Sequence, residues 1–166
     1  MRKFIFCFAI LFSVIIKAHE GGNFVESDML ASLQPGDKAA LLVVHFGTTY
    51  PETRQRTIEA INRKIADAFP QLTIREAWTS RIVIKRMAAR GEKIPVPAQA
   101  LQQLHAEGFT HVVVQSTNII EGIEMEALRG EVAQATTILK YSRVGHPLLY
   151  SVDDYRHVLQ TAVQHA

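Results

Sequence analysis

The sequence predicts an α/β fold, a four-stranded and mainly parallel sheet with helices on both faces. Two observations lead to this prediction. Short apolar runs alternate with longer segments of helical periodicity from residue 39 to the C-terminus, the order that right-handed β-α-β units produce. The first run, residues 39–46, is apolar almost throughout, as expected of a parallel strand that is covered on both faces.

The predicted elements follow one another with clear boundary signals. Pro51 opens the first helix at a position that tolerates proline. Ser80 or Thr79 caps the second helix, which ends at Gly91, and Gly108 closes the third. The predicted strands are 39–46, 72–78, 112–116 and 137–144, and the predicted helices are 51–69, 79–90, 98–107, 123–134 and 152–164. In the last helix, we expect Tyr155, Val158, Leu159 and Ala162 to face inward.

The first 18 residues have the pattern of a secretory signal peptide. Arg2 and Lys3 precede an apolar run over residues 4–16, and Ala18 supplies a small residue near its end. This run is shorter than the roughly 20 residues of a membrane span, although an uncleaved N-terminal anchor remains the alternative. We therefore predict a signal peptide (1–18), an exposed leader (19–37) and a single lobe (38–166) in an exported, periplasmic protein.

Charge and cysteine content narrow the functional classes. Without residues 1–18 the chain keeps 15 of its 18 Lys and Arg residues against 16 Asp and Glu, so its net charge is about −1 and gives no support to nucleic-acid binding. The only cysteine, Cys7, lies within the predicted signal peptide. Disulfides and cysteine-ligated metals are therefore not expected, and any metal would be held by histidine, carboxylate or water.

Two strands end in polar loops that can form a ligand site. The segment LLVVHFGTTYPETR (residues 41–54) runs from a buried strand through His45 and Gly47 into a helix, and HVVVQSTNIIEGIEMEAL (111–128) ends in a loop with Glu121 and Glu124. In open parallel sheets, ligands bind at the carboxyl ends of the strands and at helix N-termini. We therefore expect a ligand site at this edge.

Several blocks of the sequence together resemble the anaerobic sirohydrochlorin cobaltochelatases, the class II chelatases. They are LLVVHFGTTYPETR, AFPQLTIREAWTSRIVIKRM, GFTHVVVQSTNIIEGIEMEALRGEV and VGHPLLYSVDDY. The resemblance runs from about Lys38 to the C-terminus and covers the N-terminal lobe of that two-lobed family, without the C-terminal lobe whose GHG-type motif supplies the main metal-binding histidines. It implies insertion of Co²⁺ into sirohydrochlorin on the anaerobic route to cobalamin.

The resemblance assigns the catalytic carboxylate to Glu124, through the EGIEM segment that matches the family's NGxEY-like motif. Glu121 and Asn118 depart from that pattern, where the family usually has Asn and often has His. A carboxylate beside the ring can accept a pyrrole proton or bind the metal transiently. The alternative is that Glu124 only stabilises a helix N-terminus. His45 is predicted as a second catalytic residue and metal ligand, with a locally hydrogen-bonded histidine as the alternative.

Substrate binding is predicted for residues near the ends of the first two strands. Gly47, Thr48 and Thr49 offer backbone N–H groups and hydroxyls for a substrate carboxylate, although they can also cap the helix at Pro51. Sirohydrochlorin is rich in carboxylates, so Arg54 and Ser80 are predicted to contact it. Arg81, Lys85 and Arg86 are further basic residues after the second strand, and a solvated helix face is the simpler interpretation of Lys85 and Arg86.

The leading functional hypothesis is therefore a cobaltochelatase that acts on sirohydrochlorin, with Co²⁺ as substrate, Fe²⁺ or Ni²⁺ as alternative metals and no tightly bound cofactor. A non-catalytic periplasmic binder of tetrapyrrole or metal is the second hypothesis, and an inactive gene fragment the third. The expected partners are the tetrapyrrole and either a second copy of the chain, forming a homodimer, or a separate C-terminal lobe.

Overall fold

The computed structural model describes residues 29–135 and 137–164. The predicted signal peptide and most of the predicted leader lie outside these residues. The described end of the leader holds a short 3-10 helix, Leu30–Ser32 (η2), and residues 30–36 are mainly exposed while Met29 is buried. None of the helices described is both long and apolar enough to cross a membrane.

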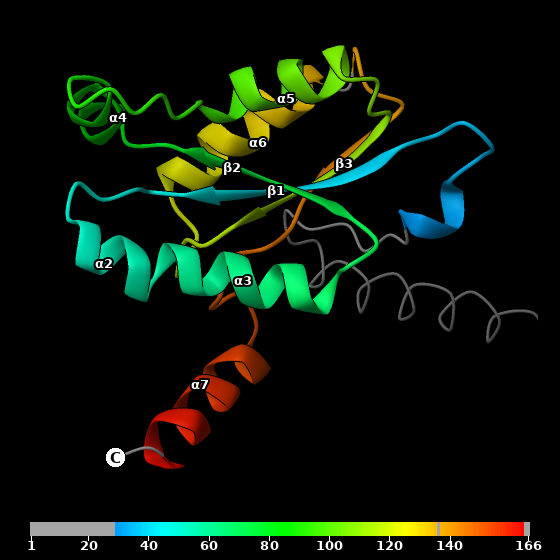
Figure 1. Cartoon of the computed structure of the whole chain (residues 1–166). Coiled ribbons are helices and arrows are strands. Elements are labelled where there is room, and N and C mark those ends of the chain that lie inside the picture. Colours follow the sequence, from blue (N-terminus) through cyan, green and yellow to red (C-terminus); the bar gives the residue numbers. More distant parts are fainter. Residues whose placement is uncertain (1–28, 136, 165–166) are drawn as a thin grey trace, which may run out of the picture.

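A four-stranded sheet forms the centre of the fold, in the order β2-β1-β3-β4. All three strand pairs are parallel, which confirms the predicted α/β class. The strands are β1 (Ala39–His45), β2 (Thr73–Trp78), β3 (His111–Ser116) and β4 (Tyr141–Val144). β1 lies in the middle of the sheet and is buried from Ala40 to His45, as its apolar sequence predicts. Figure 1 shows β1 crossing the molecule between two layers of helices.

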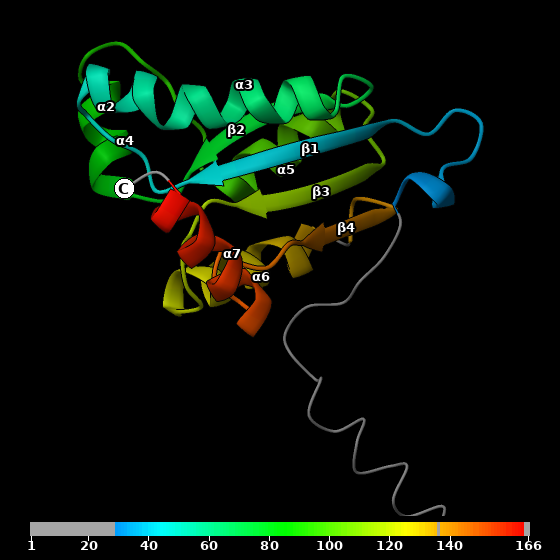
Figure 2. The same cartoon turned by 90° about the horizontal axis from the view of Figure 1, so that it is seen from below.

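The helices cover both faces of the sheet (Figures 1 and 2). α5 (Pro97–Ala106) and α6 (Ile123–Ala135) lie on one face, and α2 (Pro51–Arg56) and α3 (Ile58–Ala68) lie on the other. α4 (Arg81–Ala88) packs near the carboxyl ends of β1 and β2, where Met87 and Val83 join a small core with Ile58 and Trp78. The main core lies between the sheet and the α5–α6 layer, so the site at the strand ends rests on rigid elements.

The single helix predicted over residues 51–69 is two helices in the structure. They meet at Thr57, whose backbone departs from helical geometry (φ −116°, ψ −75°). The Thr57 hydroxyl donates a hydrogen bond of 2.7 Å to the carbonyl oxygen of Thr53. A threonine hydroxyl that donates to the carbonyl oxygen four residues earlier competes with the regular backbone hydrogen bonds and bends the helix. The apolar periodicity continues across this bend, so the sequence alone predicts one helix where the structure has two.

The fourth strand is shorter than predicted, because β4 begins at Tyr141 rather than at residue 137. The N–H groups of Ile138 and Leu139 donate hydrogen bonds to the carbonyl oxygen of Ala135 at the end of α6. These residues therefore complete the helix end as a turn. Leu139 still enters the main core, so its hydrophobicity reflects burial in a turn rather than a strand.

The last helix, α7 (Val152–Gln164), forms as predicted, but its predicted inward orientation is wrong. No residue of α7 is buried, and Tyr155 and Leu159 have 48% and 65% of their surface exposed. Val158 and Ala162 are exposed as well. Figure 1 shows α7 projecting from the body, away from both helix layers. An amphipathic sequence defines an apolar face but not its partner, and no partner lies within the described residues.

Candidate functional site

The four loops after the strands are tied together at the carboxyl edge of the sheet. The N–H groups of Thr79 and Ser80 donate to the carbonyl oxygens of His45 and Phe46, at 2.9 and 3.1 Å. The loops after β3 and β4 are joined in the same way, by Leu149 N–H donating to the Ile119 carbonyl at 2.8 Å. The N–H of Thr117, after β3, also donates to the carbonyl oxygen of Val44 in β1 at 2.9 Å, so the edge predicted to bind a ligand is a connected surface.

The turn after β1 depends on glycine at position 47. Gly47 has φ +96°, and a Cβ atom there would lie 2.4 Å from Cε3 of Trp78. Only glycine combines the left-handed backbone with this close approach. The turn exposes the neighbouring aromatic side chain, because Phe46 has half of its surface accessible to solvent.

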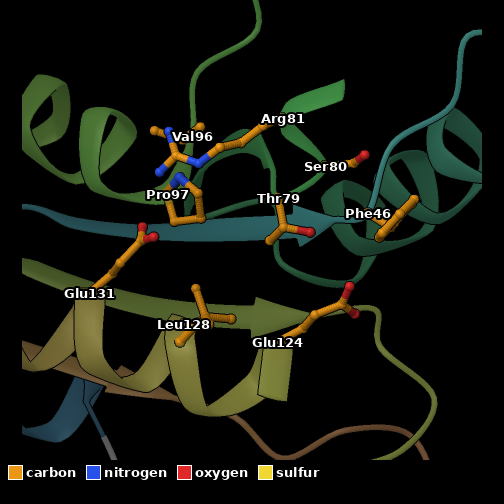
Figure 3. Close-up of a pocket in the computed structure, with 10 residues that line it drawn as sticks. Phe46, Thr79, Ser80, Arg81, Val96, Pro97, Glu124, Leu128 and Glu131 are labelled. Atoms are coloured by element: carbon orange, nitrogen blue, oxygen red, sulfur yellow. The ribbon is translucent and has the colours of Figure 1, made fainter. Parts of the chain in front are cut away.

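A partly enclosed cavity of about 230 Å³ lies beside Glu124. One wall comes from α6, with Glu124, Leu128 and Glu131, while Arg81 and Pro97 form the opposite wall (Figure 3). Further lining residues come from the strand ends and the turns of these helices: Phe46, Thr79, Ser80, Val96 and Ala127. The cavity therefore lies where the first turns of α4, α5 and α6 converge.

The polar groups of this cavity differ in how fully they are paired. Glu131 accepts a hydrogen bond of 2.9 Å from the backbone N–H of Ala98, at the start of α5. Ser80 caps α4 by accepting from the N–H of Val83 at 3.5 Å. The hydroxyl of Thr79, by contrast, is inaccessible to solvent and has no hydrogen-bond partner in the described structure. Glu124 is exposed at the start of α6.

A second, more open hollow of about 490 Å³ lies on the other side of Glu124 and Phe46. Its floor is the loop over residues 117–122 and the first turn of α6, including Ile119, Ile120 and Ile123. These three isoleucines are largely exposed, with 60%, 61% and 83% of their surface accessible. Clustered exposed apolar side chains mark binding surfaces. Glu124 thus lies where a smaller, partly enclosed cavity with polar and apolar lining residues meets a more open apolar hollow.

His45 lies elsewhere, on the face of the sheet that α3 covers. It is buried, with 2% of its surface exposed. Its Nε2 atom lies 3.0 Å from Oδ1 of Asn62 on α3, and its Nδ1 atom lies 3.1 Å from the hydroxyl of Thr117. His45 lines neither cavity at Glu124. The two residues predicted to act together are therefore on opposite sides of the sheet.

The surrounding network assigns the tautomer of His45. The amide nitrogen of Asn62 donates to the carboxylate of Glu76, so Oδ1 of Asn62 must accept, and Nε2 of His45 carries the proton. Nδ1 then accepts from the Thr117 hydroxyl. Desolvation by burial lowers the pKa of His45, against the opposing effects of Asn62 and the Glu76 carboxylate. Both ring nitrogens of this neutral histidine are occupied, so neither is open to a metal.

Three of the predicted substrate-binding residues line a separate, small cavity of about 150 Å³: Thr48, Thr49 and Arg54. The Thr48 hydroxyl accepts from the N–H of Tyr50 at 3.2 Å, which supports the capping alternative. Nη1 of Arg54 lies 2.6 Å from the Glu92 carboxylate, and its guanidinium stacks over Trp78. Arg54 is therefore already paired and is not presented to the cavities at Glu124.

Among the predicted site residues, the structure brings together Glu124 and Ser80 in one cavity. Phe46 and Glu131, which line the same cavity, were not among the predicted site residues, and Arg81, a basic residue after the second strand, was ranked below Arg54 and Ser80. Glu131 lies two helical turns after Glu124, a spacing that places both carboxylates on one face of α6 and could have been recognised. No local signal distinguished Arg81 from Arg54, because the pairing of Arg54 depends on a residue 38 positions away.

Metal ligation requires several donors close together, and the described part of the chain does not provide them. It contains no group of three or more His, Cys, Asp or Glu residues that could hold a metal ion. Glu124 is a carboxylate without a second metal donor in its cavity other than Glu131, whose carboxylate accepts from the start of α5. What the edge presents is an exposed carboxylate next to an apolar surface.

Fold and site together define an open α/β protein with an exposed carboxylate at the ligand edge of its sheet. Residues 39–166 match the family of cobalt chelatases (CbiK), and the chain belongs to that family, as the sequence motifs predicted. The sirohydrochlorin cobaltochelatase of Salmonella typhimurium is 39% identical over 128 residues, covering 76% of this chain and 48% of that protein. The sirohydrochlorin cobaltochelatase CbiKC of Nitratidesulfovibrio vulgaris is 30% identical over 133 residues, covering 79% and 47%. The chain spans about half the length of these curated relatives.

Proposed function

We propose that this protein inserts Co²⁺ into sirohydrochlorin in anaerobic cobalamin biosynthesis, and that its carboxyl edge forms the Glu124-bearing half of the reaction cleft. One observation carries the proposal: in a chain of the cobalt chelatase family, an exposed glutamate lies at the junction of two cavities at the ligand edge. Co²⁺ is the substrate metal in this proposal, with Fe²⁺ and Ni²⁺ as competing substrates.

The reaction requires a base at the ring. Two pyrrole N–H protons must leave as the metal enters, and a carboxylate next to the ring can accept a proton or bind the metal in passing. Glu124 is exposed, and the first turn of α6 holds it at the edge. It is therefore the residue to which we assign proton removal. His45, with both ring nitrogens in hydrogen bonds, is assigned a structural role instead.

The hollow beside Glu124 suits the flat face of a macrocycle. Its most exposed apolar side chains, Ile119, Ile120 and Ile123, come from one loop, residues 117–122, and from the adjoining turn of α6. The loop is fixed by two backbone hydrogen bonds, in which the N–H groups of Leu148 and Leu149 donate to carbonyl oxygens of the loop. Burying Ile119, Ile120 and Phe46 under a ring favours binding through the hydrophobic effect, about 25 cal/mol for each Å² of apolar surface removed from water.

A second protein surface completes the cleft in this proposal. The described residues contain no group of three or more His, Cys, Asp or Glu residues that could hold a metal ion, and in this proposal the partner surface supplies further donors. α7 supports a partner, because it presents Val152, Tyr155, Leu159 and Val163 to solvent along one stripe. The two partners that fit are a C-terminal lobe, in the same or a separate chain, and a second copy of this chain.

A non-catalytic binder of tetrapyrrole is the second candidate. The specific observation in its favour is that the described residues present an open, mainly apolar hollow of about 490 Å³ without a metal-binding cluster. For either function, we propose an exported, periplasmic protein on the basis of the N-terminal sequence. Cell fractionation with detection of a C-terminal tag tests this location, and recovery of the protein with the cytosol would contradict it.

The experiment that tests the function mixes the purified full chain with sirohydrochlorin and Co²⁺ without oxygen and follows the change in the tetrapyrrole absorbance. We expect insertion faster than in protein-free buffer, with Fe²⁺ and Ni²⁺ tested in parallel. Tight binding of sirohydrochlorin without insertion would favour the binder. Neither binding nor insertion would refute both candidates for this chain. Sedimentation velocity on the same sample determines whether the active species is a dimer.

A further inference from the structure

The partly enclosed cavity beside Glu124 is too small for the ring of a tetrapyrrole. Its volume of about 230 Å³ falls below the ~300–1,000 Å³ of pockets that hold whole drug-sized ligands. It adjoins the larger hollow, since Phe46 and Glu124 line both. A ring lying on the hollow would therefore have the cavity beside its rim, where side chains of the macrocycle project.

One cation lines these two cavities, and it has no partner in the described structure. Arg81 is the only Lys or Arg among the lining residues, and it makes no hydrogen bond or ion pair with any described residue. Figure 3 shows its guanidinium along the wall opposite α6, above Pro97. Arg81 is exposed, so it can meet a ligand without rearrangement of the fold.

Helix stability does not explain an arginine at this position. Arg81 is the first residue of α4, and a cation at a helix N-terminus lies at the unfavourable end of the helix dipole. The position instead adds a positive charge to a cavity where helix N-termini converge. The two carboxylates in the cavity, Glu124 and Glu131, come from α6 on the opposite wall (Figure 3).

The other polar groups of the cavity complement a carboxylate. Glu131 already accepts from the N–H of Ala98, so its negative charge is partly balanced. The hydroxyl of Thr79 lacks an acceptor. A ligand carboxylate approaching Glu124 would be repelled without a cation nearby, and Arg81 supplies that cation on the facing wall.

We propose that Arg81 binds a carboxylate side chain of the tetrapyrrole in this cavity and thereby fixes the rotation of the ring over Glu124. This inference rests on the function proposed above. The ring lies on the hollow of residues 117–122, one of its carboxylates enters the cavity, and Glu124 stands between the two. Arg81 is thus a specificity-determining residue that acts in binding, while the proton chemistry stays with Glu124.

The test is an anaerobic absorbance titration of sirohydrochlorin into the full chain, for the wild type and for Arg81→Gln, Arg81→Lys and Arg86→Gln. A charge-assisted hydrogen bond to one carboxylate predicts a dissociation constant about 5–20-fold higher in Arg81→Gln, with partial recovery in Arg81→Lys. Arg86 is exposed on the same helix and lines neither cavity, so Arg86→Gln controls for net charge. Arg86→Gln should keep both the affinity for sirohydrochlorin and the rate of cobalt insertion of the wild type.

Salt dependence provides a second readout, because wild-type affinity should fall more steeply with NaCl than that of Arg81→Gln. Equal affinity in the wild type and Arg81→Gln would overturn this inference while leaving the proposed function intact. A lower insertion rate with unchanged affinity would also overturn it. Thermal stabilisation by acetate that disappears in Arg81→Gln, without a change in sirohydrochlorin affinity, would assign the cavity to a free anion. A wild type that binds no sirohydrochlorin would refute the proposed function and this inference with it.

Discussion

Replacing Gly47 with alanine is a sharp test of how the ligand edge is built. Two costs arise at this position. The backbone has φ +96°, which costs a non-glycine residue about 1–2 kcal/mol. In addition, the new Cβ would lie 2.4 Å from Cε3 and 2.7 Å from Cδ2 of Trp78. Relieving such an overlap in a packed core typically costs about 1–3 kcal/mol, so the total loss of stability is about 2–5 kcal/mol.

The chain contains its own control for the backbone cost. Gly91 has a similar φ of +87°, but a Cβ there would meet no atom within 4 Å. Gly91→Ala should therefore lose only about 1–2 kcal/mol, and the difference between the two variants isolates the contact with Trp78. Urea unfolding followed by the fluorescence of Trp78, the only tryptophan, measures both. Equal stability of Gly47→Ala and Gly91→Ala would refute the close packing described for this turn.

Two further predictions concern the buried network on the α3 face. Asn62→Ala removes the partners of His45 Nε2 and of one Glu76 oxygen, and should lower the free energy of unfolding by about 1–3 kcal/mol in the same urea assay; an unchanged midpoint would contradict the network. The second concerns pH. Because burial lowers the pKa of His45, this histidine binds its proton at a higher pH in the unfolded chain than in the folded chain. Its contribution to the free energy of unfolding is therefore fully present above about pH 6.5. Below that pH the free energy of unfolding falls, at a limiting slope of about 1.4 kcal/mol per pH unit. His45→Gln should remove this part of the pH dependence, and an identical pH profile in that variant would count against the assignment.

The strands, and the helices on both faces of the sheet, were predictable because each element has a local signal in the sequence. Residues 39–45 are apolar in nearly every position, which a parallel strand buried on both faces requires. The predicted start of β4 at residue 137 is wrong, because Ile138 and Leu139 belong to a turn that ends α6, and Leu139 is apolar because it packs in the main core. Hydrophobicity records burial, and burial does not by itself distinguish a strand from a turn.

The site was predictable where it depends on topology and unpredictable where it depends on pairing. Strand ends meet at one edge of a parallel sheet, so Glu124 and Ser80 were correctly placed at the same edge. The partners of Arg54 and His45 are brought near by tertiary packing: Glu92 is 38 residues from Arg54, and Thr117 is 72 residues from His45. No spacing rule in the sequence reveals such contacts. The free cation at the site is accordingly Arg81.

The amphipathic helix α7 also shows that contacts between distant parts of a structure cannot be predicted from a local sequence pattern. Its apolar positions were recognised, but the sequence does not state what they contact, and the structure leaves them exposed. Clustered exposed apolar side chains are typical of binding surfaces. The proposal of a second lobe or a second copy gives that helix its contact.

The central claim is that Glu124 accepts a proton from the tetrapyrrole, and the most direct measurement compares cobalt insertion by Glu124→Gln and Glu126→Gln. Both glutamates are exposed in the first turn of α6, so both variants lose the same interaction with the helix dipole, but only Glu124 lines the cavities. Loss of a general base predicts an insertion rate about 10²–10⁴-fold lower in Glu124→Gln, with Glu126→Gln close to wild type. Equal rates in the two variants would contradict the assignment.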